Sequence, residues 1–394
     1  MRLPDTFRHI FLLLLPFASA AAGAAPFTPA SDAELLETLP GRATPARMSD
    51  LREMRAAWAR QPNDVDLAVR LARRYYEEVA AEGDPRWVGY AQAVLAPWWN
   101  APTPPPRVRV MRAVLRQFNH DFEGALADLR GAVAQDPSLG DAWAWQAAIH
   151  MVRADYPAAR RACEQLAPHA SALIGVACVA SADSLSGQAD SAAKALRAAL
   201  AAAPGAEPPE RLWALTRLAE IEERLGRFRE ADEAFRLAVA LGVADNYLLA
   251  AYADFLLDRG RPADVLTLLD GKGRSDTLLL RLVLAASQLK DPRARQWQAD
   301  LAARFDDARR GRTTHEKEEA RFLMAVRQDN AQALKLARHN YEVQREPADA
   351  RVLLEAAIAN RDRAAARPVL DWMARSGVQS VALQQLAETL KGLP

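Results

Sequence analysis

Apolar residues recur at spacings of three and four along most of the chain, and apolar and polar residues do not alternate over any useful length. Spacings of three and four place side chains on one face of a helix, whereas alternation is typical of strands. The segment HDFEGALADLRGAVAQDP, residues 120–137, shows the pattern as a polar turn followed by a one-sided helix. The chain is also rich in alanine, leucine, arginine and glutamate, which favour helices. It is therefore predicted to be all-α.

The turn-and-helix unit recurs five times between residues 120 and 271. Each copy carries a small anchor residue near the start of its helix, and the intervals between anchors are 34, 33, 39 and 34 residues. The long interval contains the segment PGAEPP, which reads as a loop insertion. The anchors are Ala125, Ala159, Ala192, Ala231 and Val265.

A second helix precedes each of these units and also carries an alanine at a matched position. Small residues let two paired helices cross closely. This arrangement resembles the tetratricopeptide repeat, whose period is 34 residues. The resemblance implies an all-α, right-handed superhelical solenoid of antiparallel helix pairs, about 8–9 repeats long, with a C-terminal capping helix. The alanines of the preceding helices are Ala113, Ala147, Ala180, Ala219 and Ala253.

The repeats are clearest over residues 106–270 and are predicted to extend, in degenerate form, over 48–394. Residues 25–47 contain four prolines and are predicted to be an extended lead-in. The first clear repeat departs from the pattern, because Arg109 and Arg112 stand where apolar residues are expected. Weaker pairs are predicted at 64–99, 276–304, 314–342 and 348–375, followed by a capping helix in VQSVALQQLAETLKG.

Residues 1–24 are typical of a secretory signal peptide. Arg2 and Arg8 flank a short charged start, and an apolar run follows at residues 10–17. Small residues at 18–24 then form A-x-A cleavage sites. The apolar run falls short of the ~20 residues that a transmembrane helix needs, and an uncleaved amphipathic anchor is the alternative. No later segment is apolar enough to span a bilayer, and the alanine- and arginine-rich composition suggests a bacterium. We therefore expect the mature protein in the periplasm, without an integral membrane segment.

Several function classes are disfavoured. The formal net charge is +1, and the leader contributes two arginines and one aspartate, so the mature chain is about neutral and has no electrostatic footprint for nucleic acid. The HEKEE segment at 315–319 lacks the second histidine of a zinc helix, and GKGR at 271–274 lacks P-loop spacing. We expect no catalytic residues, no metal site, no cofactor and no enzymatic activity.

The repeat register implies a set of residues facing a concave groove. They would form an aromatic and acidic wall, with one basic residue toward the N-terminal end. Aromatic side chains supply contact area in interfaces. The competing interpretation is that exposed acids are ordinary on helices. The predicted partner-binding residues are Trp213, Thr216, Glu220, Glu223, Tyr247, Asp254, Asp258 and Arg107.

Both cysteines lie in the segment CEQLAPHASALIGVAC. In the repeat register Cys163 belongs to the second helix of one pair and Cys178 to the first helix of the next, with a turn midway between them. Two antiparallel helices joined there bring the cysteines level, and an exported protein meets an oxidising compartment. A disulfide is the leading prediction, with two reduced core thiols as the alternative.

These observations predict a periplasmic scaffold that presents a concave helical groove to a protein or peptide partner of the cell envelope. Helical-repeat proteins stack their pairs so that an extended surface remains available for binding. The alternative is a carrier of a small ligand, metal or glycan, or a helical domain that serves an envelope enzyme or assembly complex.

Overall fold

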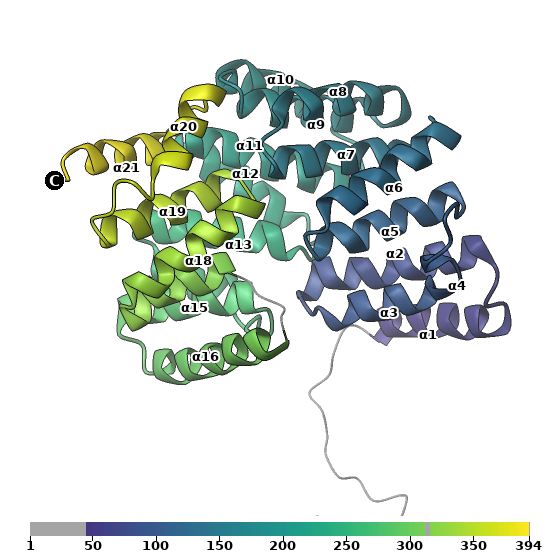
Figure 1. Ribbon diagram of the computed structural model, residues 1–394, viewed down its shortest axis with the longest axis horizontal. Helices are drawn as coiled ribbons and strands as arrows, with labels where there is room; N and C mark the ends of the chain where they lie inside the picture. Colours follow the sequence, from purple (N-terminus) through teal and green to yellow (C-terminus); the bar gives the residue numbers. More distant parts are fainter. Residues whose placement is uncertain (1–44, 312–315, 394) are drawn as a thin grey trace, which may run out of the picture. The chain divides into compact units, whose positions relative to one another are not determined.

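The computed structural model describes residues 45–311 and 316–393, and all of its regular elements are helices. The chain divides into two units, Met1–Ser49 and Asp50–Pro394. The predicted signal peptide, and all of the lead-in before Pro45, lie outside the described residues. The second unit consists of helices that pack in consecutive pairs joined by short turns (Figure 1).

The five clearest predicted repeats are all present as helix pairs. Loop residues 203–207 between α10 and α11 accommodate much of the insertion at PGAEPP. The five pairs are α5 (Pro106–Phe118) with α6 (Phe122–Gln135), α7 (Gly140–Val152) with α8 (Tyr156–Leu166), α9 (Ala172–Ser184) with α10 (Ala189–Ala202), α11 (Pro208–Arg224) with α12 (Phe228–Ala240), and α13 (Asn246–Asp258) with α14 (Pro262–Leu268).

The flanking segments also form helix pairs. In the described residues the helices before and after the clear repeats are α1 (Pro45–Arg60), α2 (Val65–Glu82), α3 (Arg86–Val94), α4 (Ala96–Trp99), α15 (Asp276–Leu289), α16 (Arg293–Gly311), α17 (Glu316–Phe322) with a π-helical turn at Leu323–Arg327, α18 (Asn330–Val343), α19 (Pro347–Ala359), α20 (Arg367–Ser376) and α21 (Val381–Lys391). The predicted pairs at 276–304 and 314–342 correspond to α15 with α16 and to α17 with α18, although residues 314 and 315 lie outside the described residues. In 348–375 both predicted helices form, but α19 packs more against the C-terminal helix α21, which was also predicted, than against α20.

The anchor positions explain why the helices pair at these points. All ten anchor residues of the five clear repeats are buried, with at most 4% of each side chain exposed. A methyl group lets two helix backbones approach more closely than a larger side chain would, so the repeated alanines set the crossing points. A large apolar residue four positions after the anchor fills the space beside it, as Phe235 does in α12 with 0% exposure. The all-α, tetratricopeptide-like fold predicted from the sequence is confirmed.

The two arginines that break the apolar pattern of α5 tie the end of α4 and the loop after it, residues 100–105, to the first clear repeat. Arg112 is 5% exposed and binds the buried Asp128 of α6 through Nε at 2.8 Å and Nη2 at 2.5 Å. Its Nη1 also donates to the backbone oxygen of Trp99 at 2.6 Å. Arg109 donates to the backbone oxygen of Pro104 at 3.3 Å. A guanidinium group has five donors, so one side chain can satisfy a carboxylate and a loop carbonyl together.

The last helices pack against the second and third clear helix pairs, α7–α8 and α9–α10, which are distant in sequence. The indole nitrogen of Trp372 in α20 donates to the hydroxyl of Tyr156 in α8 at 3.0 Å. The backbone nitrogen of Arg345 donates to the backbone oxygen of Val152 at 2.7 Å. The Gln379 side chain accepts from the backbone nitrogen of Ala189 at the start of α10. The C-terminal repeats therefore contact α7–α10 as well as their neighbours along the chain (Figure 1).

Candidate functional site

Five of the eight predicted binding residues lie together on α11 and α13. They are joined by basic residues of α11 and of the C-terminal repeats. We call this group the α11–α13 cluster. It comprises Arg217, Glu220, Glu223, Tyr247, Asp254, Asp258, Arg281, Arg321 and Arg351.

Asp254 connects three helix pairs. Its carboxylate receives two hydrogen bonds from Arg281 of α15, at 3.1 and 2.6 Å, and two from Arg321 of α17, at 3.0 and 2.9 Å. Burial alone would raise the pKa of Asp254, but the two guanidinium charges outweigh burial and hold that pKa well below its usual range. Asp254 is therefore ionised at neutral pH and already bound at both oxygens.

Asp258, one turn further along α13, is bound in the same manner. Both carboxylate oxygens accept from Arg351 of α19, one of them at 2.8 Å from Nη2. Arg351 also donates through Nε to Glu355 at 2.7 Å. Bidentate pairs of this type fix orientation as well as charge. The acids that the sequence predicted to face a groove thus face arginines of the same chain.

Tyr247 is held at the edge of the cluster, and 48% of its surface remains exposed. Its hydroxyl donates to Glu220 at 2.5 Å, and Glu220 in turn binds Arg217 at 3.0 Å. The Arg217 guanidinium lies 4.6 Å from the centre of the Tyr247 ring, close enough for a cation–π contact. Tyr247 is consequently an exposed aromatic ring whose orientation is set by two neighbours.

Glu223 is the acid of the α11–α13 cluster whose carboxyl has a raised pKa. Burial, followed by the negative charges of Asp258 and Glu220, raises the pKa of its carboxyl from 4.5 to about 8, although Arg351 acts in the opposite direction. Between about pH 4.5 and 8 the folded protein therefore holds a proton at Glu223 that the unfolded chain releases. The contribution of this group to stability falls as the pH rises through that interval.

We expect Glu223→Gln to remove this pH dependence. A glutamine carries no charge at any pH, so the free energy of unfolding of the variant should exceed that of the wild type by a few kcal/mol at pH 9 and about equal it at pH 5. Urea unfolding followed by circular dichroism at both pH values measures this difference. Glu388→Gln, at an exposed glutamate of α21, is the matched control and should leave the pH dependence unchanged. If the free energy of unfolding of Glu223→Gln changed with pH as that of the wild type does, the raised pKa of Glu223 would be contradicted.

The other three predicted residues lie apart from the cluster or serve the core. Thr216 is 2% exposed, and its hydroxyl donates to the backbone oxygen of Leu212 at 2.8 Å. Trp213 is partly buried and packs against the core clusters that surround the disulfide and α11. Arg107 is exposed on α5 and lies 3.6 Å from Asp66 of α2.

The basic half of the cluster was not predicted from the sequence. Arg281, Arg321 and Arg351 lie in the degenerate repeats, where the register could not be assigned. Arg217 lies on α11 one position after Thr216, and its side chain turns toward Tyr247. One feature of the sequence did indicate such partners. The several acids of α11 and α13 require basic partners where they are partly buried.

The cysteine prediction is confirmed. Cys163 of α8 and Cys178 of α9 form a disulfide with Sγ atoms 2.03 Å apart and Cα atoms 5.4 Å apart. Both cysteines are buried, and Trp213 packs against the small apolar cluster that contains them. The disulfide therefore links the α7–α8 pair to the α9–α10 pair, next to Trp213 of α11.

The described residues contain no group of three or more His, Cys, Asp or Glu side chains placed to hold a metal ion. Within the same residues, none of the helices has the length and apolar character that crossing a membrane requires. The arrangement of the α11–α13 cluster is one of paired charges with a partly exposed aromatic ring at its edge.

No family model matches the sequence, and no curated protein matches it. Similar solved structures include a human IFIT1 dimer with m7Gppp-AAAA, at 13% identity and a TM-score of 0.43, covering 88% of this chain and 86% of that one. A human IFIT1 dimer with PPP-AAAA has 14% identity and a TM-score of 0.45 over the same shares of the two chains. This distant likeness concerns the arrangement of helices.

Proposed function

We propose that the protein is a non-catalytic helical-repeat scaffold that presents its surface to a protein or peptide partner in the bacterial periplasm. Stacked helix pairs of this type bury their apolar faces on one another and leave an extended surface for binding. The buried disulfide suits an oxidising compartment, which is where an exported protein resides. The signal-like start of the chain supports the same location.

The observation that carries the proposal is the half-exposed, fixed ring of Tyr247. Among the described residues it is one of four large apolar side chains with more than 40% exposure. Tyrosine is enriched where interfaces concentrate their binding energy. A ring that is already oriented by Arg217 and Glu220 loses little conformational freedom when a partner covers it.

The paired acids limit which groups of the α11–α13 cluster can contact a partner. Asp254 and Asp258 are bound by arginines of the same chain, so a partner would meet neutralised pairs there rather than free carboxylates. The proposed contact is therefore made mainly by the aromatic ring of Tyr247 and the polar groups around it. Trp213 contributes by supporting α11 from the core side.

A photo-crosslinking experiment in the native envelope tests this proposal. A photoreactive residue at position 247 is expected to give one dominant cross-linked partner, and Tyr247→Ala is expected to reduce capture of that partner about ten-fold. Leu237 on α12 is 51% exposed and supplies two separate matched controls: Leu237→Ala for the capture experiment, and a photoreactive residue at position 237 for the cross-linking experiment. Unchanged capture by Tyr247→Ala, or the same cross-links from both positions, would remove Tyr247 from the binding surface.

A further inference from the structure

A pocket of about 630 Å³ lies where the C-terminal repeats meet α8. Its volume is in the range of small-molecule sites. The lining comes from the start of α8, the end of α9, α18, α19 and α20, and no residue of α11 or α13 takes part. The pocket is therefore separate from the α11–α13 cluster.

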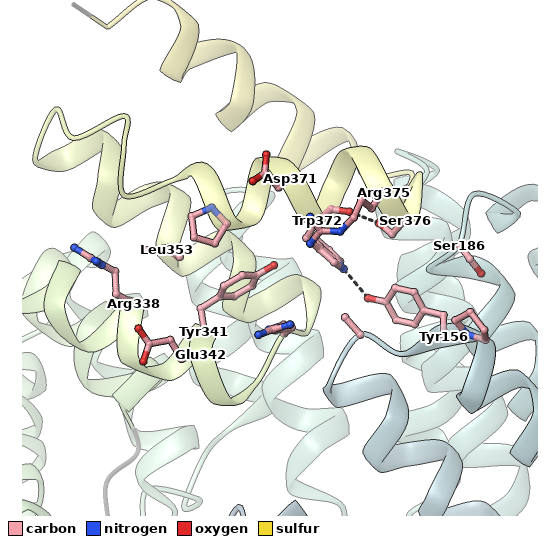
Figure 2. Close-up of a pocket in the computed structure, with 14 residues that line it drawn as sticks. Tyr156, Ser186, Arg338, Tyr341, Glu342, Leu353, Asp371, Trp372, Arg375 and Ser376 are labelled. Carbon is pink, nitrogen blue, oxygen red and sulfur yellow. Dashed lines mark hydrogen bonds between the residues drawn. The ribbon is translucent and has the colours of Figure 1, made fainter.

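One side of the pocket is aromatic. Tyr156 and Trp372 are 4% exposed each and are joined by the hydrogen bond from the indole nitrogen to the phenol oxygen (Figure 2). Leu353, which is 1% exposed, and Pro368 add apolar surface. An apolar lining with a few convergent polar groups is typical of sites for small organic ligands.

The hydroxyl of Tyr341 is the unusual polar group of this pocket. Tyr341 is 4% exposed, and within the described residues its buried hydroxyl has no hydrogen-bond partner. Figure 2 shows the Tyr341 ring at the wall of the pocket, with its hydroxyl directed toward Trp372. A buried hydroxyl without a partner is unfavourable, and a ligand that accepts a hydrogen bond from it removes that penalty.

Three arginines, Arg338, Arg345 and Arg375, also line the pocket. None of the three guanidinium groups forms an ion pair within the part of the chain that the structure describes. Burial raises the pKa of Tyr341, while the charges of Arg345 and Arg375 act to lower it, so both guanidinium groups lie within electrostatic reach of the phenol.

Two acids, Glu342 and Asp371, line the pocket as well, and Asp371 lies 3.8 Å from Arg367 outside it. The lining thus carries three positive charges and two negative charges. Of these groups, Arg345 and Arg375 are the two that act on the Tyr341 oxygen. The carboxylate of Asp349, outside the lining, acts on the phenol in the opposite direction, so the two arginines and this acid leave one net positive charge near it. That net charge favours an anion, and the aromatic side favours an apolar body.

We propose that this pocket binds an organic carboxylate with an aromatic or aliphatic body. The carboxylate accepts hydrogen bonds from the hydroxyl of Tyr341 and from the guanidinium groups of Arg345 and Arg375. The body of the ligand packs against Tyr156 and Trp372. Guanidinium groups match the two oxygens of a carboxylate, and a phenol adds a third donor. The carboxylate belongs either to a small free acid or to the C-terminus of a peptide with an apolar last residue.

Calorimetric titration of the full chain distinguishes these sources. The probes are 3-phenylpropionate, its amide, the peptide acetyl-Ala-Ala-Phe with a free carboxylate, and the same peptide amidated. Binding of an acid but not of its amide supports the proposal and identifies the source of the carboxylate. Failure of both acids to bind at millimolar concentration, or equal binding of acids and amides, would overturn it.

Two variants separate binding from folding. Tyr341→Phe removes a hydroxyl that has no partner, so the melting temperature should stay the same or rise while affinity for the acid falls about ten-fold. Arg375→Gln should weaken binding by at least about ten-fold. Arg367→Gln, on the same helix but outside the pocket lining, is the matched control and should bind normally. Full affinity in both Tyr341→Phe and Arg375→Gln would also overturn the assignment, whatever the result at Tyr247.

Discussion

Replacing Asp254 by asparagine is expected to lower the free energy of unfolding by about 3–5 kcal/mol, the largest effect of any single substitution considered. The carboxylate of Asp254 satisfies two largely buried guanidinium groups, those of Arg281 and Arg321, with four hydrogen bonds. Removing one partner of a buried ion pair leaves an uncompensated charge. Here, among the described residues, Arg321 loses its ion-pair partner, and Arg281 keeps only Glu318, 3.7 Å away. Urea unfolding at pH 7 measures the loss.

Two further variants serve as controls for Asp254→Asn. Asp264 binds Arg261 at the surface, where Asp264→Asn should cost less than about 1 kcal/mol. Adding Arg321→Met to Asp254→Asn removes one unpaired charge and should restore part of the lost stability, because the two substitutions affect one network. Because the folded pKa of Asp254 is depressed, the stabilisation is complete above the unfolded value of 3.8 and is lost as the pH falls below it. A loss at Asp254 no larger than at Asp264 would show that the cluster is not a stabilising network.

Reduction of the disulfide is expected to lower the free energy of unfolding by about 3 kcal/mol. The bond between Cys163 and Cys178 closes a loop with a sequence separation of 15 residues, and a loop of this length restricts the unfolded chain by that amount in the chain-entropy model. Urea unfolding of the wild type with and without a phosphine reductant measures the difference.

A double variant supplies the control for the disulfide. Cys163→Ala with Cys178→Ala should unfold at the same urea concentration with and without reductant, since it has no bond to break. Small side chains suit both buried positions, so the variant is expected to fold. Two free thiols in non-reduced peptide maps of the native protein, or a wild type that does not respond to reduction, would contradict this prediction.

The repeat pattern predicted the helix pairs because it rests on local geometry. The alanines at matched positions, such as Ala147 and Ala159, are buried at helix crossings, and the prolines and short turns between them end each helix. The disulfide followed from the same register. Contacts between neighbouring repeats are therefore largely readable from the sequence.

The partners of the acidic residues could not be predicted in this way. Arg281, Arg321 and Arg351 reach α13 from 27, 67 and 93 residues further along the chain. Which of many arginines meets a given acid depends on how the degenerate C-terminal repeats pack, and their sequence pattern is weak. The pocket was even less predictable from the sequence. Tyr156 and Trp372 are separated by 216 residues, and no sequence pattern relates one to the other.

The packing of the last helices on α7–α10 changes how the stability of the array is distributed. In an ordinary repeat protein each unit touches only its neighbours, so stability is close to a sum of local terms along one dimension. The hydrogen bonds from Arg345 to Val152, from Trp372 to Tyr156 and from Ala189 to Gln379 add coupling between units that are distant in sequence. The stability of α7–α10 thus depends on residues that lie 190 to 216 positions further along the chain.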